Sequence, residues 1–271
     1  MNSSDPPPAQ PQKSRLLIGT SGYSFQDWVG SFYPPGTPRG KMFEYYLSHF
    51  PTVEINAMYY RILPPSVMDQ ISGRAPEHYP IIVKAHKSLT HERHEAWAQL
   101  PAWKESVAPL VERGQMAGAL LQFPYAFRLS EASLEHLRRA STELAPHPVF
   151  VEFRHASWMR PDVFAFLREQ GLHFVSVDEP PLPNLLPAAP VVTGNTLYVR
   201  FHGRNSDNWW GGQGDRYDYN YSSSELTEWR EKIRKVRDQV CATYLFFNNC
   251  HQGQAASNAQ MMQALMEGGS V

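Results

Sequence analysis

The sequence predicts an α/β protein whose fold is a (β/α)8 TIM-type barrel. Eight short apolar segments alternate with helical segments, an order that requires a parallel sheet with right-handed crossovers. The length of 271 residues is close to the ~250 residues typical of this barrel. An open doubly wound sheet usually carries a glycine-rich phosphate turn after its first strand. Here that turn reads GTSGYS rather than GxGxxG, and GxxxxGKS or GxxxxGKT occurs nowhere, so the closed barrel fits better.

Composition indicates one large domain. Hydrophobic residues make up 42% of the chain, enough for a substantial core. The first 14 residues, MNSSDPPPAQPQKS, lack the apolar centre of a signal peptide, so we expect a disordered lead over 1–14 and a single barrel domain over 15–271.

The predicted strands share one pattern: each is hydrophobic until its last residues and then ends on a polar group. Such a pattern suits strands that are buried along their length and open to a site at their carboxyl ends. The strands are expected at 15–20, 52–56, 80–85, 118–123, within 148–158, and at 172–178, 195–202 and 243–249.

The predicted helices follow from their start and stop signals. Pro51 ends the first helix, Ser66 is a candidate N-cap, and Gly114 and Gly171 are stop signals. The segment EPPLPNLLPAAPVVTG between strands six and seven has little helical character, so one helix is expected to be replaced there by a proline-rich loop. The helices are expected at 41–50, 66–73, 103–114, 130–144, 158–169, 226–240 and 258–266.

The fifth strand, within PVFVEFRHASW, carries the clearest functional signal. Glu152 and Arg154 share one face of a strand whose other face is apolar, and a charged pair in such a setting must be paired. The pair is either a structural ion pair or part of a site. Because other strands end in the same way, we expect their polar residues to gather at the carboxyl-end face of the barrel. These residues are Glu54, Asn56, Lys84, Gln122, Asp178, Arg200 and His202.

Several motifs in order resemble the YecE-like family, also called domain of unknown function 72. They are GTSGYSFQDWVGSFYP, VEIN with the following YYR, QFP, VEFRHASW, VRFHGR and FFNN, and the resemblance runs from about Leu16 to the last helix. The resemblance implies a barrel of the type predicted above and a pocket, but no reaction. The motif residues matched here are Glu54, Asn56, Gln122, Glu152, Arg154, Trp158, Arg200, His202 and Asn248.

These residue types suggest a division of roles. Arginine forks suit phosphate or carboxylate, whereas glutamate and histidine suit general acid and base work. We therefore expect Glu54, Glu152, His202 and Asp178 to be catalytic. Substrate binding is expected from Asn56, Lys84, Gln122, Arg154, Trp158, Arg200 and Asn248. The alternative is that these charges neutralise one another and only fill the barrel.

Three functions remain open at this point. The first is a hydrolase or lyase that acts on an anionic, phosphate-bearing substrate without a cofactor or an obligatory metal. The second is a phosphoesterase acting on nucleic acid with a divalent metal held by Glu54, Glu152, Asp178 and His202. The third is a non-catalytic module in which tryptophans and arginines of 204–216 stack on bases or on a sugar.

A separate metal site in the third connection is disfavoured. The segment AHKSLTHERHEAW holds His86, His91 and His94, but their spacing matches no recognised ligand pattern.

The net charge limits which partners the protein can bind, and the number of cysteines indicates its cellular compartment. A formal net charge of −1 and a pI near 6.8 argue against binding of polyanions by net charge alone. The two cysteines are too few for a disulfide framework, so we expect a cytoplasmic protein. No apolar stretch is long enough for a membrane span. A small anionic ligand or a nucleic-acid fragment is the expected partner, and the sequence leaves protein partners open.

Overall fold

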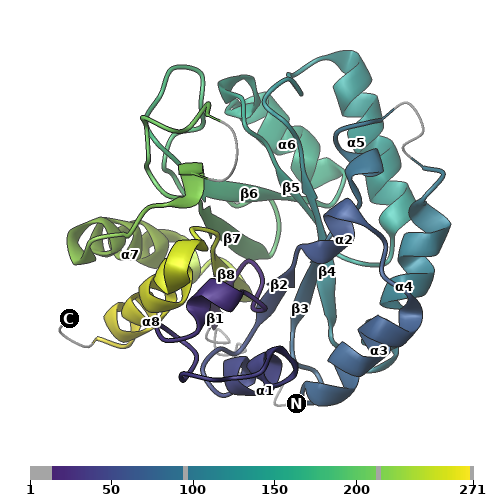
Figure 1. Cartoon of the computed structure of the whole chain (residues 1–271). Helices are drawn as coiled ribbons and strands as arrows, with labels where there is room; N and C mark the ends of the chain where they lie inside the picture. The colour runs from purple at the N-terminus through teal and green to yellow at the C-terminus, as the bar shows by residue number, and fades with distance from the viewer. Residues whose placement is uncertain (1–13, 94–96, 212–214, 269–271) are drawn as a thin grey trace, which may run out of the picture.

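The chain forms a nearly closed barrel of eight parallel strands with helices outside it, as Figure 1 shows. The computed structural model describes residues 14–93, 97–211 and 215–268. The hydrogen-bonded strand order is β1-β8-β7-β6-β5-β4-β3-β2. A bridge between Ser21 and Glu54, with the Gly22 amide donating to the Glu54 carbonyl at 2.8 Å, brings the ends of β1 and β2 together. The predicted (β/α)8 barrel is therefore confirmed. The strands are β1 (Arg15–Thr20), β2 (Val53–Ile55), β3 (Ile81–Lys84), β4 (Met116–Gln122), β5 (Val149–Glu152), β6 (Leu172–Asp178), β7 (Thr196–Phe201) and β8 (Ala242–Phe247).

The helices largely follow the predicted alternation. Residues 179–195 contain no helix, which confirms the predicted loop between β6 and β7. Several helix starts were predicted wrongly. The starts expected at 103, 226 and 258 lie inside helices that begin at Leu100, Ser223 and Gln254. Ser66 lies inside a helix whose first residue is Pro65, a position where the missing amide hydrogen costs nothing. Trp158 ends a short 3₁₀ turn before its helix begins. The helices are α1 (Met42–Leu47), α2 (Ala57–Tyr60), α3 (Pro65–Arg74), α4 (Leu100–Glu112), α5 (Glu131–Leu144), α6 (Pro161–Glu169), α7 (Ser223–Arg237) and α8 (Gln254–Glu267).

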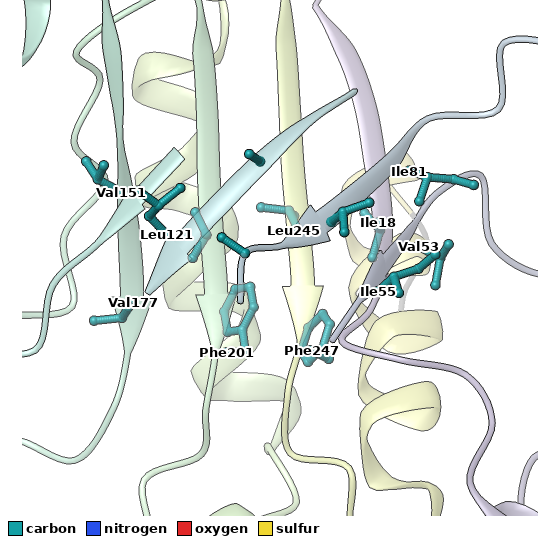
Figure 2. Packing of buried hydrophobic residues seen from close by; sticks show 14 of the residues in the cluster. Ile18, Val53, Ile55, Ile81, Leu121, Val151, Val177, Phe201, Leu245 and Phe247 are labelled. Carbon is teal, nitrogen blue, oxygen red and sulfur yellow. The ribbon is translucent and has the colours of Figure 1, made fainter. Parts of the chain in front are cut away.

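The two faces of the strands pack into two cores. The outer core lies between the sheet and the helices, and Figure 2 shows part of it, including Phe201 and Phe247, whose rings stack at 4.5 Å between centroids. The inner core fills the barrel near the amino ends of the strands. It consists of Leu17, Ile82, Leu120, Phe150, Val175, Tyr198, Tyr244 and Phe246. Above this apolar layer the inward-facing residues become polar.

The N-terminal lead predicted over 1–14 lies outside the described residues except for Ser14. Ser14 is buried, and its carbonyl oxygen accepts a hydrogen bond from Arg237 Nη2 at 3.1 Å. None of the helices in the described ranges combines the length and apolar character that a membrane span needs.

Gly19 is required where β1 meets β2. A Cβ atom at this position would overlap the Thr52 carbonyl oxygen and crowd the Tyr46 hydroxyl group. We expect Gly19→Ala to lower the free energy of unfolding by about 1–3 kcal/mol, because backbone on the neighbouring strand must move. Gly73→Ala is the matched control: nothing lies within 4 Å of its Cβ position in α3, and alanine there should stabilise by about 0.5–1 kcal/mol. Urea unfolding of both variants measures the effect, and equal stability would contradict the close approach.

Candidate functional site

An ion pair network crosses the inside of the barrel. Arg200 on β7 donates from Nη2 to Glu54 Oε1 on β2 at 2.6 Å and from Nη1 to Glu152 Oε2 on β5 at 2.6 Å. Its Nε donates to Glu54 Oε2 at 2.9 Å, and the Tyr198 hydroxyl group donates to the same oxygen. β2, β5 and β7 are not neighbours in the sheet, so these side chains can meet only across the interior. Both carboxylates are fully buried, and Arg200 is 1% exposed.

A second group of side chains lies next to Glu152. Arg154 Nη2 is 2.7 Å from Glu152 Oε1, and Arg154 Nη1 donates to Glu179 Oε2 at 3.1 Å. His202 Nε2 lies 3.1 Å from Glu152 Oε1, and the Asn248 amide group lies 3.0 Å from His202 Nδ1. Arg154 Nη2 also lies 3.1 Å from His202 Nε2, so this ring nitrogen faces both a carboxylate oxygen and a guanidinium donor. We call Glu54, Glu152, Arg154, Glu179, Arg200 and His202 the inner ion network.

Burial and charge set the protonation states of this network. Burial alone would raise the pKa of Glu152, but the positive charges of Arg200 and Arg154 hold it well below its usual value. Burial, reinforced by Arg154, lowers the pKa of His202 to about 3. Burial raises the pKa of Glu179 to about 7, although Arg154 opposes the shift. At neutral pH, Glu152 is therefore an anion that binds protons weakly, and His202 is neutral.

A cavity of about 280 Å³ opens at the carboxyl ends of the strands, above the inner ion network. We call it the mouth cavity. Its walls come from α2, the ends of β3 and β4, and the segments after β3, β4, β5, β6 and β7. They comprise Tyr59, Tyr60, Lys84, His91, Gln122, Pro124, Tyr125, Arg154, Leu185, Trp209, Trp210, Arg216 and Tyr217.

The mouth cavity is cationic and aromatic. Arg154, Arg216 and Lys84 line it, and no aspartate or glutamate is among the described residues around it. The Nε atoms of Arg154 and Arg216 are buried and have no hydrogen-bond partner in the described part of the chain. Arg154 also lies over the Trp209 ring, with its guanidinium carbon 5.7 Å from the ring centroid.

Lys84 lines this cavity and has an unusual pKa. Its Nζ donates to Gln122 Oε1 at 2.9 Å and lies 4.3 Å from the centre of the Tyr59 ring. Burial and the nearby charge of Arg200 lower the pKa of Lys84 to about 7. The amine is therefore partly neutral at physiological pH.

The sequence-predicted site residues occupy different places. Lys84, Gln122 and Arg154 line the mouth cavity. Glu54, Glu152, Arg200 and His202 lie together beneath it and do not line it, and Asn248 contacts His202. Asn56 lines a separate cavity beside α3.

Trp158 lies away from the mouth cavity. It is completely buried, and its ring stacks on Phe153 at 4.0 Å between centroids. Its indole nitrogen donates to the Phe127 carbonyl at 2.7 Å. The expected contact between Trp158 and substrate is therefore wrong, because the ring packs in the outer core.

Asp178 also lies outside the inner ion network. Its carboxylate accepts hydrogen bonds from Tyr221 at 2.6 Å, Trp229 at 2.5 Å and Arg204 Nη2 at 2.8 Å, on the outer side of the sheet. The expectation that Asp178 joins the other acids was wrong, and the inward-facing acid is the next residue, Glu179. The signal was the period of two, because Glu179 is in phase with Val175 and Val177 of β6.

The aromatic walls were only partly anticipated. The tryptophans of 204–216 suggested stacking, and Trp209 and Trp210 do line the cavity. Tyr125, whose ring lies 5.0 Å from that of Trp210, and Tyr217 carried no motif signal. His91 had been considered only as a metal ligand.

The residues proposed as metal ligands do not form a donor set. Among the described residues, no group of three or more histidine, cysteine, aspartate or glutamate side chains is placed to hold a metal ion. Guanidinium groups already occupy the oxygens of Glu54 and Glu152, and Asp178 points to the outer core. His94 lies outside the described residues.

Fold and site together define a class: a barrel protein with a cationic, aromatic pocket at the carboxyl ends of its strands. The chain belongs to the family described as protein of unknown function DUF72, whose model matches residues 17–270. It is 31% identical to UPF0759 protein YunF of Bacillus subtilis, over 93% of this chain and 95% of that protein. The crystal structure of a DUF72 family protein from Thermotoga maritima is similar at a TM-score of 0.86 and 36% identity, covering 93% of this chain and 99% of that one. The crystal structure of a DUF72 family protein from Enterococcus faecalis is similar at a TM-score of 0.83 and 27% identity, covering 93% of this chain and 95% of that one. The predicted resemblance to the YecE-like family is confirmed.

Removal of Arg200 should be costly, because it leaves Glu54 and Glu152 buried without their shared counter-ion. We expect Arg200→Met to lower the free energy of unfolding by roughly 3–5 kcal/mol. Arg160→Met is the control, since the Arg160–Asp162 pair is exposed and such pairs contribute little. Adding Glu54→Gln and Glu152→Gln to Arg200→Met should restore part of the loss. Chemical denaturation measures the stability of all three variants. An Arg200→Met protein as stable as its parent would contradict the expected cost of leaving the two carboxylates unpaired.

The lowered pKa of Lys84 predicts a pH-dependent stability difference. An ordinary lysine has a pKa of about 10.4 in the unfolded chain, so protonation of Lys84 costs stability below pH 7. This cost disappears as the pH rises from about 7 to 10. Lys84→Met removes this cost. The free energy of unfolding of the variant minus that of its parent should therefore be larger at pH 6 than at pH 10. Thermal unfolding across this range measures the difference, with Lys104→Met as the exposed-lysine control, and the opposite trend would contradict the shift.

Proposed function

We propose that this protein is an enzyme, a hydrolase or a lyase, that binds a small phosphate-bearing substrate in the mouth cavity. Lys84 carries the proton transfer, and Arg154 with Arg216 binds the phosphate. The observation that supports this most is that Arg154, Arg216 and Lys84 line one cavity whose described lining has no acid. A phosphate group can accept hydrogen bonds from several such donors at once.

The aromatic walls support a substrate with a planar group or a sugar beside the phosphate. Tyr125, Trp209, Trp210 and Tyr217 surround the space, and rings of this kind stack on flat or sugar faces. A cavity of about 280 Å³ suits one small ligand rather than a passing polymer.

The acid and base roles first assigned to Glu54, Glu152 and His202 fit the geometry less well than a role for Lys84. The first three are fully buried beneath the cavity, and every oxygen of the two carboxylates has a partner in the inner ion network. A general base must reach the proton that it takes. Lys84 lines the cavity, and its pKa of about 7 is close to the operating pH. In this proposal the inner ion network holds the floor rigid while Lys84 acts.

A nucleic-acid fragment is the second candidate ligand. Trp210 is 59% exposed at the cavity rim, where it could stack on the base of a terminal nucleotide. The pocket would then hold one end of a strand.

Arg216 allows a test that leaves the inner ion network intact. Arg216→Met should weaken binding of inorganic phosphate and of adenosine 5′-monophosphate by about 10-fold or more, because a charge-assisted contact is lost. Its melting temperature should change little, since Arg216 has a cavity position and a stacking contact with Tyr217 but no ion pair in the described part of the chain. Arg128→Met is the matched control: that arginine is exposed, lies over Tyr125 and does not line the cavity.

Isothermal titration calorimetry measures the affinities, and a short single-stranded oligonucleotide tests the second candidate in the same assay. Equal affinity of the Arg216→Met and Arg128→Met proteins for both phosphates, or no binding by the parent protein, would refute the proposed anion site.

A further inference from the structure

The position of Lys84 suits a nucleophile as well as a base. It is the last residue of β3, so its backbone is fixed in the barrel wall while its amine faces the mouth cavity. A protonated amine has three N–H groups to donate, yet in the described part of the chain Nζ has one oxygen acceptor, Gln122 Oε1. No described carboxylate forms an ion pair with it. A neutral amine needs fewer acceptors and keeps a lone pair for reaction.

Burial favours this neutral form. Arg200 and Arg154 also oppose a positive charge on Nζ, whereas Glu152 and Glu54 favour one, and the pKa of Lys84 stays lowered to about 7. Desolvated lysines beside other cations are the form in which this side chain attacks carbonyl groups.

We infer that Lys84 forms an imine with the carbonyl carbon of an aldehyde or ketone whose phosphate group is held by Arg154 and Arg216. This inference rests on the proposed function, since it adds a carbonyl group to the phosphate-bearing substrate. It narrows the activity to a lyase that works through a covalent intermediate.

The step balances without an oxidant or a reductant. The lone pair of Lys84 Nζ forms a bond to the carbonyl carbon, and the electron pair of the C=O double bond moves to oxygen, which takes a proton. The resulting carbinolamine loses water as the C=N bond forms, so amine and carbonyl give imine and water. When the substrate carries a hydroxyl group on its β-carbon, loss of the hydroxyl proton lets the Cα–Cβ bond break, the β-carbon leaves as an aldehyde or ketone, and the electron pair moves into the protonated imine to give an enamine. Protonation of the enamine carbon and addition of water then release the second product and restore the Lys84 amine, which completes lyase chemistry.

Two aromatic neighbours lie beside the amine. The centroid of the Tyr59 ring lies 4.3 Å from Nζ, and the His91 ring lies 5.1 Å from the Tyr59 ring by centroid. Burial lowers the pKa of His91 to about 4, so its imidazole is neutral and adds no positive charge near Lys84 at physiological pH.

Trapping with borohydride tests the inference. The protein is incubated with pyridoxal 5′-phosphate, a planar phosphate-bearing aldehyde, then reduced with sodium borohydride, and labelled lysines are located by peptide mass spectrometry. Lys84 should be labelled at lower reagent concentration than Lys87, an internal control three residues away whose side chain is 41% exposed. Inorganic phosphate should compete at Lys84 and not at Lys87. Pyridoxal, which lacks the phosphate, should need about 10-fold more reagent.

The pH dependence separates this chemistry from ordinary surface labelling. With a pKa of about 7, the neutral fraction of Lys84 rises only about twofold between pH 7 and 9, whereas that of an ordinary lysine rises about 100-fold. Labelling of Lys84 should follow the first pattern. Lys84→Arg should lose the specific adduct while retaining phosphate binding in the calorimeter.

Two outcomes separate the two proposals. If phosphate binds the parent protein but Lys84 is labelled no more readily than Lys87, the imine is refuted and the anion site stands. If phosphate does not bind and does not protect Lys84, the proposed function itself fails.

Discussion

The contact between Arg200 and two glutamates is the constraint on which the upper half of the barrel depends. A single guanidinium group binds Glu54 from β2 and Glu152 from β5 while its own strand, β7, lies elsewhere in the ring. Paired and hydrogen-bonded in this way, the three charges can be buried, whereas any one of them alone could not. The interaction adds little net stability compared with an apolar core of the same shape. It does limit the distances between β2, β5 and β7, which are not neighbours in the sheet.

Glu54 and Glu152 lie beneath the mouth cavity, so the described side chains that line the cavity above them include basic residues and no acid. Arg154 shows how this happens. Its two terminal nitrogens bind Glu152 and Glu179, which holds the side chain in one orientation and leaves its buried Nε without a partner. Burial is the main cause of the lowered pKa of Lys84; the charge of Arg200 adds to it, and Glu152 and Glu54 oppose it. The network below the cavity therefore orients one lining residue, Arg154, while the unusual pKa of Lys84 comes mainly from its burial.

The sequence predicted the barrel and the inner residues well, and it predicted their accessibility poorly. Alternation within each strand is a local property, and it was enough to identify Glu54, Glu152 and Arg200 as residues on one face. Whether a side chain lies under the cavity floor or in its wall depends on its height along the barrel axis and on which loops cover it. That height separates Lys84 in the cavity wall from Glu54 beneath it, although both face inward.

The errors at Asp178 and Trp158 have the same physical origin. Both follow or end a strand, so proximity in sequence to the carboxyl end suggested a place at the site. Asp178 is one residue out of phase with the inward face, and in a strand one residue exchanges inside for outside. Trp158 is the last residue of a 3₁₀ turn, and its ring packs back onto Phe153. The aromatic walls at Tyr125 and Tyr217 come from loops, whose paths depend on tertiary contacts and leave no periodic pattern in the sequence.

Arg154 belongs to the inner ion network and also lines the mouth cavity. The charged side chains below the floor are constrained because they pair with one another. A single substitution there leaves a buried charge without its counter-ion. The wall residues Arg216 and Trp210 lie outside the inner ion network, so replacing them leaves its buried charges paired. Arg154 belongs to both groups, since it pairs with two carboxylates and lines the mouth cavity. The floor can therefore remain fixed while the loops around Arg154 vary the side chains that line the cavity.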